Sequence, residues 1–147
     1  MGAYRVVGPF VADDSFLRHV DRKNRIRDGV VSQEAFKDKH ETLSFTYQDQ
    51  NLKTEDGLDQ YQRDKALPSG DLPGLVRLTF HDLATTLEPP LPPRPDPVPQ
   101  DEKYGHLHCC TDRPTDDVQR REMARLAVRN GIVAEFVRKK KRKDRYQ

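Results

Sequence analysis

Cysteine is scarce in this sequence of 147 residues, and its two cysteines, Cys109 and Cys110, are adjacent. Neighbouring cysteines can bridge each other only through a strained ring that lies outside ordinary disulfide geometry. A disulfide framework is therefore excluded as the source of stability. We expect both residues to be free thiols, as is usual in a reducing cytosol.

Long apolar runs are also missing. Residues 1–10 contain no run of signal-peptide length before Asp13 and Asp14, and nothing later in the chain approaches a membrane span. Met1-Gly2 opens like a myristoylation signal, but Val6 stands where Ser or Thr is usual. These features predict a cytoplasmic protein without a membrane segment.

Several catalytic motifs are absent: the sequence has no glycine-rich phosphate loop, no nucleophile elbow and no His-Glu-x-x-His helix. It also has no internal repeat. Hydrophobic residues make up 34% of the chain and charged residues another 34%, with 11 prolines, so we expect part of the chain to stay outside the core. The length suits one small domain with tails.

Charge is distributed unevenly along the chain. The formal net charge is +2, but the segment from Arg138 to Arg145 holds seven basic residues and one acidic residue, which leaves the rest of the chain at −4. This asymmetry argues against a globally basic nucleic-acid-binding domain and places any attraction for polyanions at the C-terminus. The candidate polyanion-binding residues are Arg138, Lys139, Lys140, Lys141, Arg142 and Lys143. The alternative is that this run is a solvated tail that keeps the protein soluble.

The hydrophobic pattern and the turn residues predict the order of elements. We expect a lead-in at 1–29, in which Phe16, Leu17 and Val20 form one side of a helical turn. Strands at 30–36 and 43–47 follow, then a helix capped by Thr54, and then a strand at 75–78 that continues into a helix at 80–87, where Thr79 and Asp82 have capping-box spacing. After a proline-rich connector at 88–100, we expect a strand at 105–110, a helix at 116–129 and a strand at 132–137.

This order indicates an α+β fold with a small mixed β-sheet, two or three packed helices, a proline-rich connector and a basic C-terminal tail. We expect one domain at residues 30–137, preceded by the lead-in and followed by the tail at 138–147. Within the connector, Pro90–Arg94 also resembles a ligand for an aromatic-lined groove, although a stiff polyproline link explains it as well.

The chemically densest stretch is Gly105–Cys110. As a strand it would place His106, His108 and Cys110 on one face and Leu107 with Cys109 on the other. Imidazole and thiolate are common zinc ligands, so His106 and His108 are the candidate metal ligands. Cys110 is roughly 13 Å from His106 along an extended strand, so a third ligand would come from elsewhere, such as His81 or an Asp.

Two other interpretations of this stretch remain open. In the first, Leu107 and Cys109 pack inward, and the histidines are surface residues or hydrogen-bonding partners. In the second, one cysteine is a nucleophile, for which the pair of Cys110 with His108 has the better geometry. No third residue that would orient such a pair can be identified, so we assign no catalytic residue.

Four short motifs occur in order: Val31-Ser32-Gln33-Glu34-Ala35-Phe36, Leu43-Ser44, Gly74-Leu75-Val76-Arg77-Leu78-Thr79, and a proline-bearing link that ends at His106. Their order resembles a set of small uncharacterised bacterial proteins. The resemblance covers about residues 14–110, implies a bacterial origin and implies no activity. One histidine of that pattern matches His106, whereas residues 108–110 depart from it.

Together these features predict a noncatalytic bacterial accessory domain. It would bind a protein or nucleic-acid partner through an exposed sheet edge and the basic tail, and it would need no cofactor. The alternative is a small metal-dependent hydrolase or nuclease centred on His106 and His108, with zinc as the expected metal.

Overall fold

The computed structural model describes residues 10–21, 25–37, 42–96 and 105–139. Its main sheet has five strands in the order β5-β1-β4-β7-β6, and every pairing in it is antiparallel. These strands are β1 (Ser15–Val20), β4 (Ser44–Tyr47), β5 (Gly74–Thr79), β6 (Arg94–Pro95) and β7 (His108–Cys110). A separate hairpin joins β2 (Ile26–Arg27) to β3 (Val30–Val31). The α+β class is confirmed, with an antiparallel rather than a mixed sheet.

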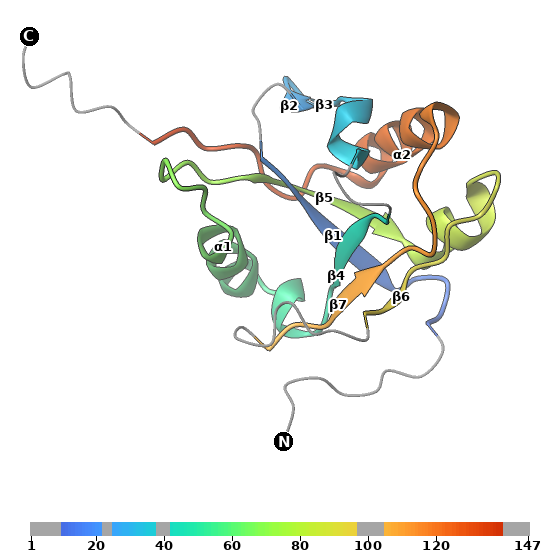
Figure 1. Cartoon of the computed structure of the whole chain (residues 1–147). Helices are drawn as coiled ribbons and strands as arrows, with labels where there is room; N and C mark the ends of the chain where they lie inside the picture. Colours follow the sequence, from blue (N-terminus) through green and yellow to red (C-terminus); the bar gives the residue numbers. More distant parts are fainter. Residues whose placement is uncertain (1–9, 22–24, 38–41, 97–104, 140–147) are drawn as a thin grey trace, which may run out of the picture.

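The helices lie on both faces of the sheet (Figure 1). The long helices are α1 (Glu55–Asp64) and α2 (Asp117–Asn130), and the short ones are η2 (Gln33–Phe36), η3 (Asn51–Lys53) and the π-helical η4 (Asp82–Thr86). On one face, α2, η2 and the β2–β3 hairpin pack over the larger core, which includes Phe16 and Phe45. On the other face, Leu17 and Leu75 pack against Tyr61 of α1.

The strand β1 corrects the helical turn expected near the N-terminus. Phe16 and Leu17 are both fully buried because they point to opposite faces of a strand that is covered on both sides. Adjacent buried positions do not alternate, so the sequence pattern looked helical. Residues 15–20 are therefore part of the sheet, where β1 lies between β5 and β4.

Three other expected strands are shorter or absent. Of residues 105–110, only His108–Cys110 form a strand, β7. Residues 30–36 form only the two-residue β3, after which Ser32 accepts a hydrogen bond from the backbone N–H of Glu34 and begins η2. Residues 132–137 make two isolated bridges rather than a strand. By contrast, the strand expected at 43–47 is confirmed as β4, and Phe45 and Tyr47, with Leu43 just before the strand, contact the larger core as alternation predicts.

The predicted caps and helices agree closely with the structure. Thr54 accepts a hydrogen bond from the backbone N–H of Gly57 at the start of α1. Asp116 and Gln119 form a capping box at the start of α2, which begins one residue later than expected. Thr79 and Asp82 also bond reciprocally, each side chain accepting from the other's backbone N–H.

Among the described residues, the two edges of the main sheet differ in what borders them. Along β5, Leu72 and Val137 exchange two backbone hydrogen bonds, and the N–H of Leu75 donates to the carbonyl of Ala134. At the opposite edge, β6 contains Pro95, which has no N–H to donate. Binding of a partner at a sheet edge therefore stays a prediction.

Candidate functional site

The strand β7 brings a polar row onto the face of the sheet that α1 covers only in part. Cys109 is fully buried in the larger core together with Leu107, so the inward packing expected for these two residues is confirmed. Alternation then places His108 and Cys110 on the opposite face. His108 lies across from Thr46 in register, and Thr46 accepts a hydrogen bond from the hydroxyl of Tyr61 on α1.

His106 is held by a carboxylate from another element. Its Nδ1 lies 3.1 Å from Oδ2 of Asp49, and only 10% of its side chain is exposed. The other oxygen of Asp49 accepts a hydrogen bond from the backbone N–H of Leu52, which fixes the carboxylate in place. The imidazole also meets the ring of Tyr61 edge-on, with the centroids 5.7 Å apart. His106 therefore has a defined ring orientation.

His108 has a second carboxylate of its own. Its Nδ1 lies 2.9 Å from Oδ2 of Asp96, at the end of β6, and the two side chains are 12% and 17% exposed. The backbone N–H of Asp96 donates to the carbonyl of His108, so the β6–β7 pairing aligns both residues. The proline-rich segment thus does more than connect elements, because its end supplies a partner to the site.

The two pairs leave the same atom available on each ring. When Nδ1 donates its proton to a carboxylate, Nε2 carries the free lone pair of the neutral imidazole. This arrangement orients histidines that act as general bases, and it also orients histidines that bind metals. Among the described residues, no hydrogen-bond partner is recorded for Nε2 of either His106 or His108.

The residues proposed as a third metal ligand are not brought together. In the described ranges, no group of three or more His, Cys, Asp or Glu residues has the arrangement needed to hold a metal ion. His81 lies on the surface just after β5, and β5 is separated from β7 by two strands. Cys110 shares the face of His108, but its Sγ is not part of such a group.

The cysteines are poor nucleophiles in this environment. Burial, together with the neighbouring Cys110, raises the pKa of Cys109 to about 12. Burial also raises the pKa of Cys110, with an added contribution from the negative charge of Asp96. Since the thiolate is the reactive form, neither cysteine is activated in this fold.

Two of the candidate polyanion-binding residues, Arg138 and Lys139, lie in the described part of the chain and are exposed. The backbone N–H of Lys139 donates to Asp71, so the chain is fixed to the β5 side of the molecule up to this residue. Residues 140–143 lie outside the described residues. The chain thus enters the tail near the β5 edge of the sheet, whereas His108 lies on β7, near the opposite edge.

The sequence indicated His106 and His108 but neither of their partners. Asp49 is 57 residues from His106 along the chain, and Asp96 is 12 residues from His108. The only signal was a general one, that a site here would need an acidic residue from another element. In the structure, β7 lies between β4 and β6, and this placement identifies Asp49 and Asp96 as the acidic partners.

Comparison with protein-family models, with curated proteins and with solved structures gives no match. The resemblance to small bacterial proteins therefore remains a prediction. Within the described ranges, no helix has both the length and the apolar character needed to cross a membrane.

Proposed function

We propose that the protein is a small hydrolase in which His106 and His108 transfer protons through their Nε2 atoms. The observation that carries this proposal is that both imidazoles, one at the start of β7 and one two residues before it, are positioned by their own carboxylates. A base and an acid held on one face are what hydrolysis of an ester or phosphodiester requires.

The burial of this polar row supports a functional role. Thr46, Gln48 and His106 are each at most 8% exposed, on a sheet face where apolar residues would cost less to bury. All three are hydrogen-bonded, so the polar groups buried here are satisfied. Hydrogen bonds to buried groups fix side-chain orientation, which is what proton transfer needs.

The same carboxylate pairing supports a second candidate, a metal-dependent hydrolase. Histidines that bind zinc through one ring nitrogen commonly donate from the other to a carboxylate, as Asp49 and Asp96 would accept here. A bound zinc ion would supply an activated water. The described residues offer two such ligands, one fewer than catalytic zinc sites usually have, so proton transfer by the histidines is the better-supported candidate.

A substrate panel with matched variants tests the proposal. The purified protein is assayed with a chromogenic ester, a chromogenic phosphodiester and a fluorogenic RNA. We expect turnover of at least one, with a bell-shaped pH profile, and a loss of about 100-fold or more in His106→Ala and in His108→Ala. His81→Ala is the matched control, because this histidine is exposed just after β5, and two strands separate β5 from β7.

The carboxylate partners give a second readout that keeps the test informative if an alanine variant folds poorly. Asp49→Asn and Asp96→Asn preserve side-chain shape but change the tautomer of the paired ring, so the acidic or basic limb of the pH profile should move. Activity removed by chelation and restored by zinc or cobalt would select the metal-dependent candidate. Absence of turnover on all three substrates, or full activity in both histidine variants, would contradict the proposal.

A further inference from the structure

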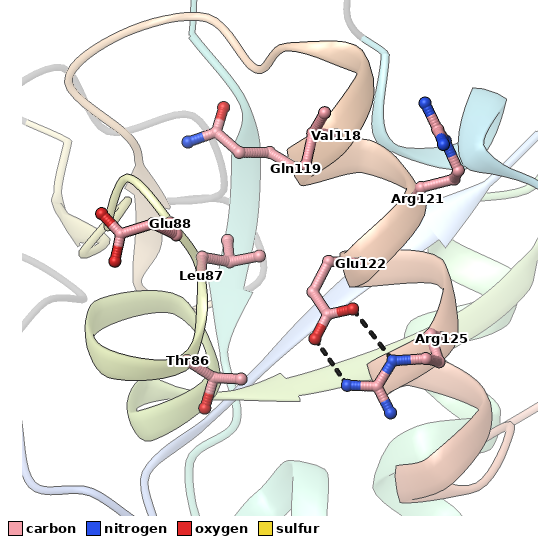
Figure 2. Close-up of a pocket in the computed structure, with 8 residues that line it drawn as sticks. All are labelled: Thr86, Leu87, Glu88, Val118, Gln119, Arg121, Glu122 and Arg125. Atoms are coloured by element: carbon pink, nitrogen blue, oxygen red, sulfur yellow. Dashed lines mark hydrogen bonds and ion pairs between the residues drawn. The ribbon is translucent and has the colours of Figure 1, made fainter.

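A groove lies on the face of the sheet opposite the histidines, between the end of η4 and the first half of α2 (Figure 2). Its volume is about 540 Å³, which is within the range of ligand-binding pockets. Eight residues line it: Thr86, Leu87, Glu88, Val118, Gln119, Arg121, Glu122 and Arg125.

Both walls of the groove are fixed by hydrogen bonds. The backbone N–H of Leu87 donates to the carbonyl of Asp82, which closes the π-helical turn of η4. On the other wall, Gln119 belongs to the capping box of α2 and also donates through Nε2 to the carbonyl of Pro89, at 2.7 Å. This bond ties the two walls together, so the groove exists before any ligand binds.

The charges in the groove are arranged unevenly. Three of the four arginines of α2 have acidic partners: Arg120 with Asp117, Arg125 with Glu122, and Arg129 with Asp82. For the fourth, Arg121, no ion pair or hydrogen bond is recorded within the described residues, and the same is true of Glu88 on the facing wall. Figure 2 shows these two side chains at opposite sides of the groove.

Two of the eight lining residues are apolar, Leu87 and Val118. Leu87 is fully buried beneath the groove, while Val118 is 63% exposed and is one of the few large hydrophobic side chains on the surface. An exposed valine on a helix costs little by itself, but here it lies between an anionic and a cationic side chain. A ligand complementary to this surface needs an apolar group flanked by one positive and one negative group.

We propose that this groove binds an extended segment of a protein partner, in which a basic side chain pairs with Glu88 and an acidic side chain with Arg121. An apolar side chain between them covers Val118. A peptide provides this order readily, because side chains along an extended chain project at regular intervals. The groove is a second site, independent of the histidine row, by which we mean His106 and His108.

A set of short capped peptides tests the proposal by nuclear magnetic resonance titration of the labelled protein. The probe is Lys-Ala-Leu-Ala-Glu, and the control peptides replace both charged residues with lysine, both with glutamate, or leucine with glycine. We expect the probe to shift the amide resonances of residues 86–88 and 118–125 and to bind more tightly than each control peptide.

Charge-reversal variants then assign the contacts. Glu88→Lys and Arg121→Glu should each weaken binding of the probe about fivefold, as expected for an exposed ion pair. The double variant exchanges the two charges and should restore binding, because the peptide can lie in the reverse direction. Arg63→Glu on the exposed side of α1 is the control. The proposal would be overturned if the probe shifted only amide resonances on other surfaces, or if its affinity were unchanged in both charge-reversal variants.

Discussion

The most completely buried charge among the described residues is Asp82, whose side chain is fully inaccessible to solvent. Burial alone would raise its pKa, but hydrogen bonds from Asn130 and Thr79 and the positive charge of Arg129 outweigh burial and lower the pKa below the ordinary value of 3.8. One oxygen accepts from Arg129 at 2.7 Å, and the other from Asn130 and from the backbone of Thr79. This single carboxylate joins η4 to the end of α2.

Replacement of Asp82 by Asn should therefore lower the free energy of unfolding by about 2–4 kcal/mol at pH 7, since charge-assisted bonds to a buried group are lost. Because the folded pKa lies below the unfolded one, this contribution is complete above about pH 4 and declines as the pH falls through the folded pKa. The stability gap between Asp82→Asn and the wild type should narrow at low pH.

Denaturant unfolding at pH 7 and at about pH 3 measures that gap directly. Asp59→Asn, on the exposed side of α1, is the matched control and should change stability by no more than about 0.5 kcal/mol. A gap that stays constant down to the lowest pH at which the protein folds would show that Asp82 acts through shape alone.

Asp82 also shows how far sequence reasoning extends at this scale. Its spacing from Thr79 predicted the reciprocal cap that the structure contains. Its bonds to Arg129 and Asn130 span 47 and 48 residues, and no local pattern encodes contacts of that separation. Asp49 and Asp96 were missed at the histidines for the same physical reason.

At the scale of elements, helix α1 contains a glycine at a position where alanine usually stabilises a helix. Gly57 is buried, and a methyl group added there would lie 1.9 Å from the carbonyl oxygen of Asn51 and 2.9 Å from Oγ1 of Thr54. The first of these atoms is backbone, in the short helix η3 that precedes α1. The glycine permits η3 to fold back against the start of α1.

Gly57→Ala should therefore destabilise the protein by about 1–3 kcal/mol, opposite in sign to its helix propensity, because the added methyl overpacks the η3–α1 junction. Gln60→Ala, on the exposed side of the same helix, controls for propensity and should be close to neutral. Thermal unfolding of both variants decides the question: an increase in stability for Gly57→Ala would mean that the junction relaxes at little cost.

Elements whose pattern depends on one buried face were predicted well, and elements buried on both faces were not. Alternation in β4 and around β7 correctly separated Phe45 and Cys109 from the polar side. In β1, where both faces are covered, the same reasoning failed, and residues 132–137 looked like a strand although only isolated bridges form. The strand expected at 105–110 forms only at His108–Cys110, so of the two candidate histidines only His108 lies on β7.

At the scale of the whole molecule, charge is separated between the body and the C-terminal tail. The tail from Arg138 to Arg145 has a net charge of +6, whereas the outer surface of α1 exposes Glu55, Asp56 and Asp59. The chain enters the tail from the β5 side, where Val137 pairs with Leu72. A polyanion bound to the tail would meet an acidic surface at α1 before it reached the histidine row, so we treat polyanion binding as a property of the tail alone.

Deletion of residues 138–147 should therefore abolish salt-sensitive binding to a short single-stranded oligonucleotide while leaving the fold intact, because the Leu72–Val137 bridge is retained. With at most seven basic residues in the tail, the logarithm of the binding constant should fall with the logarithm of salt concentration with a slope no steeper than about −5. Fluorescence anisotropy over a range of salt concentrations measures this slope.

A variant with the tail lysines and arginines changed to glutamine should behave like the deletion, whereas charge removal at Lys53 and Arg63 on the body should have little effect. Binding that survives the deletion would place the polyanion on the folded body, and the acidic surface of α1 would then have to lie outside its path.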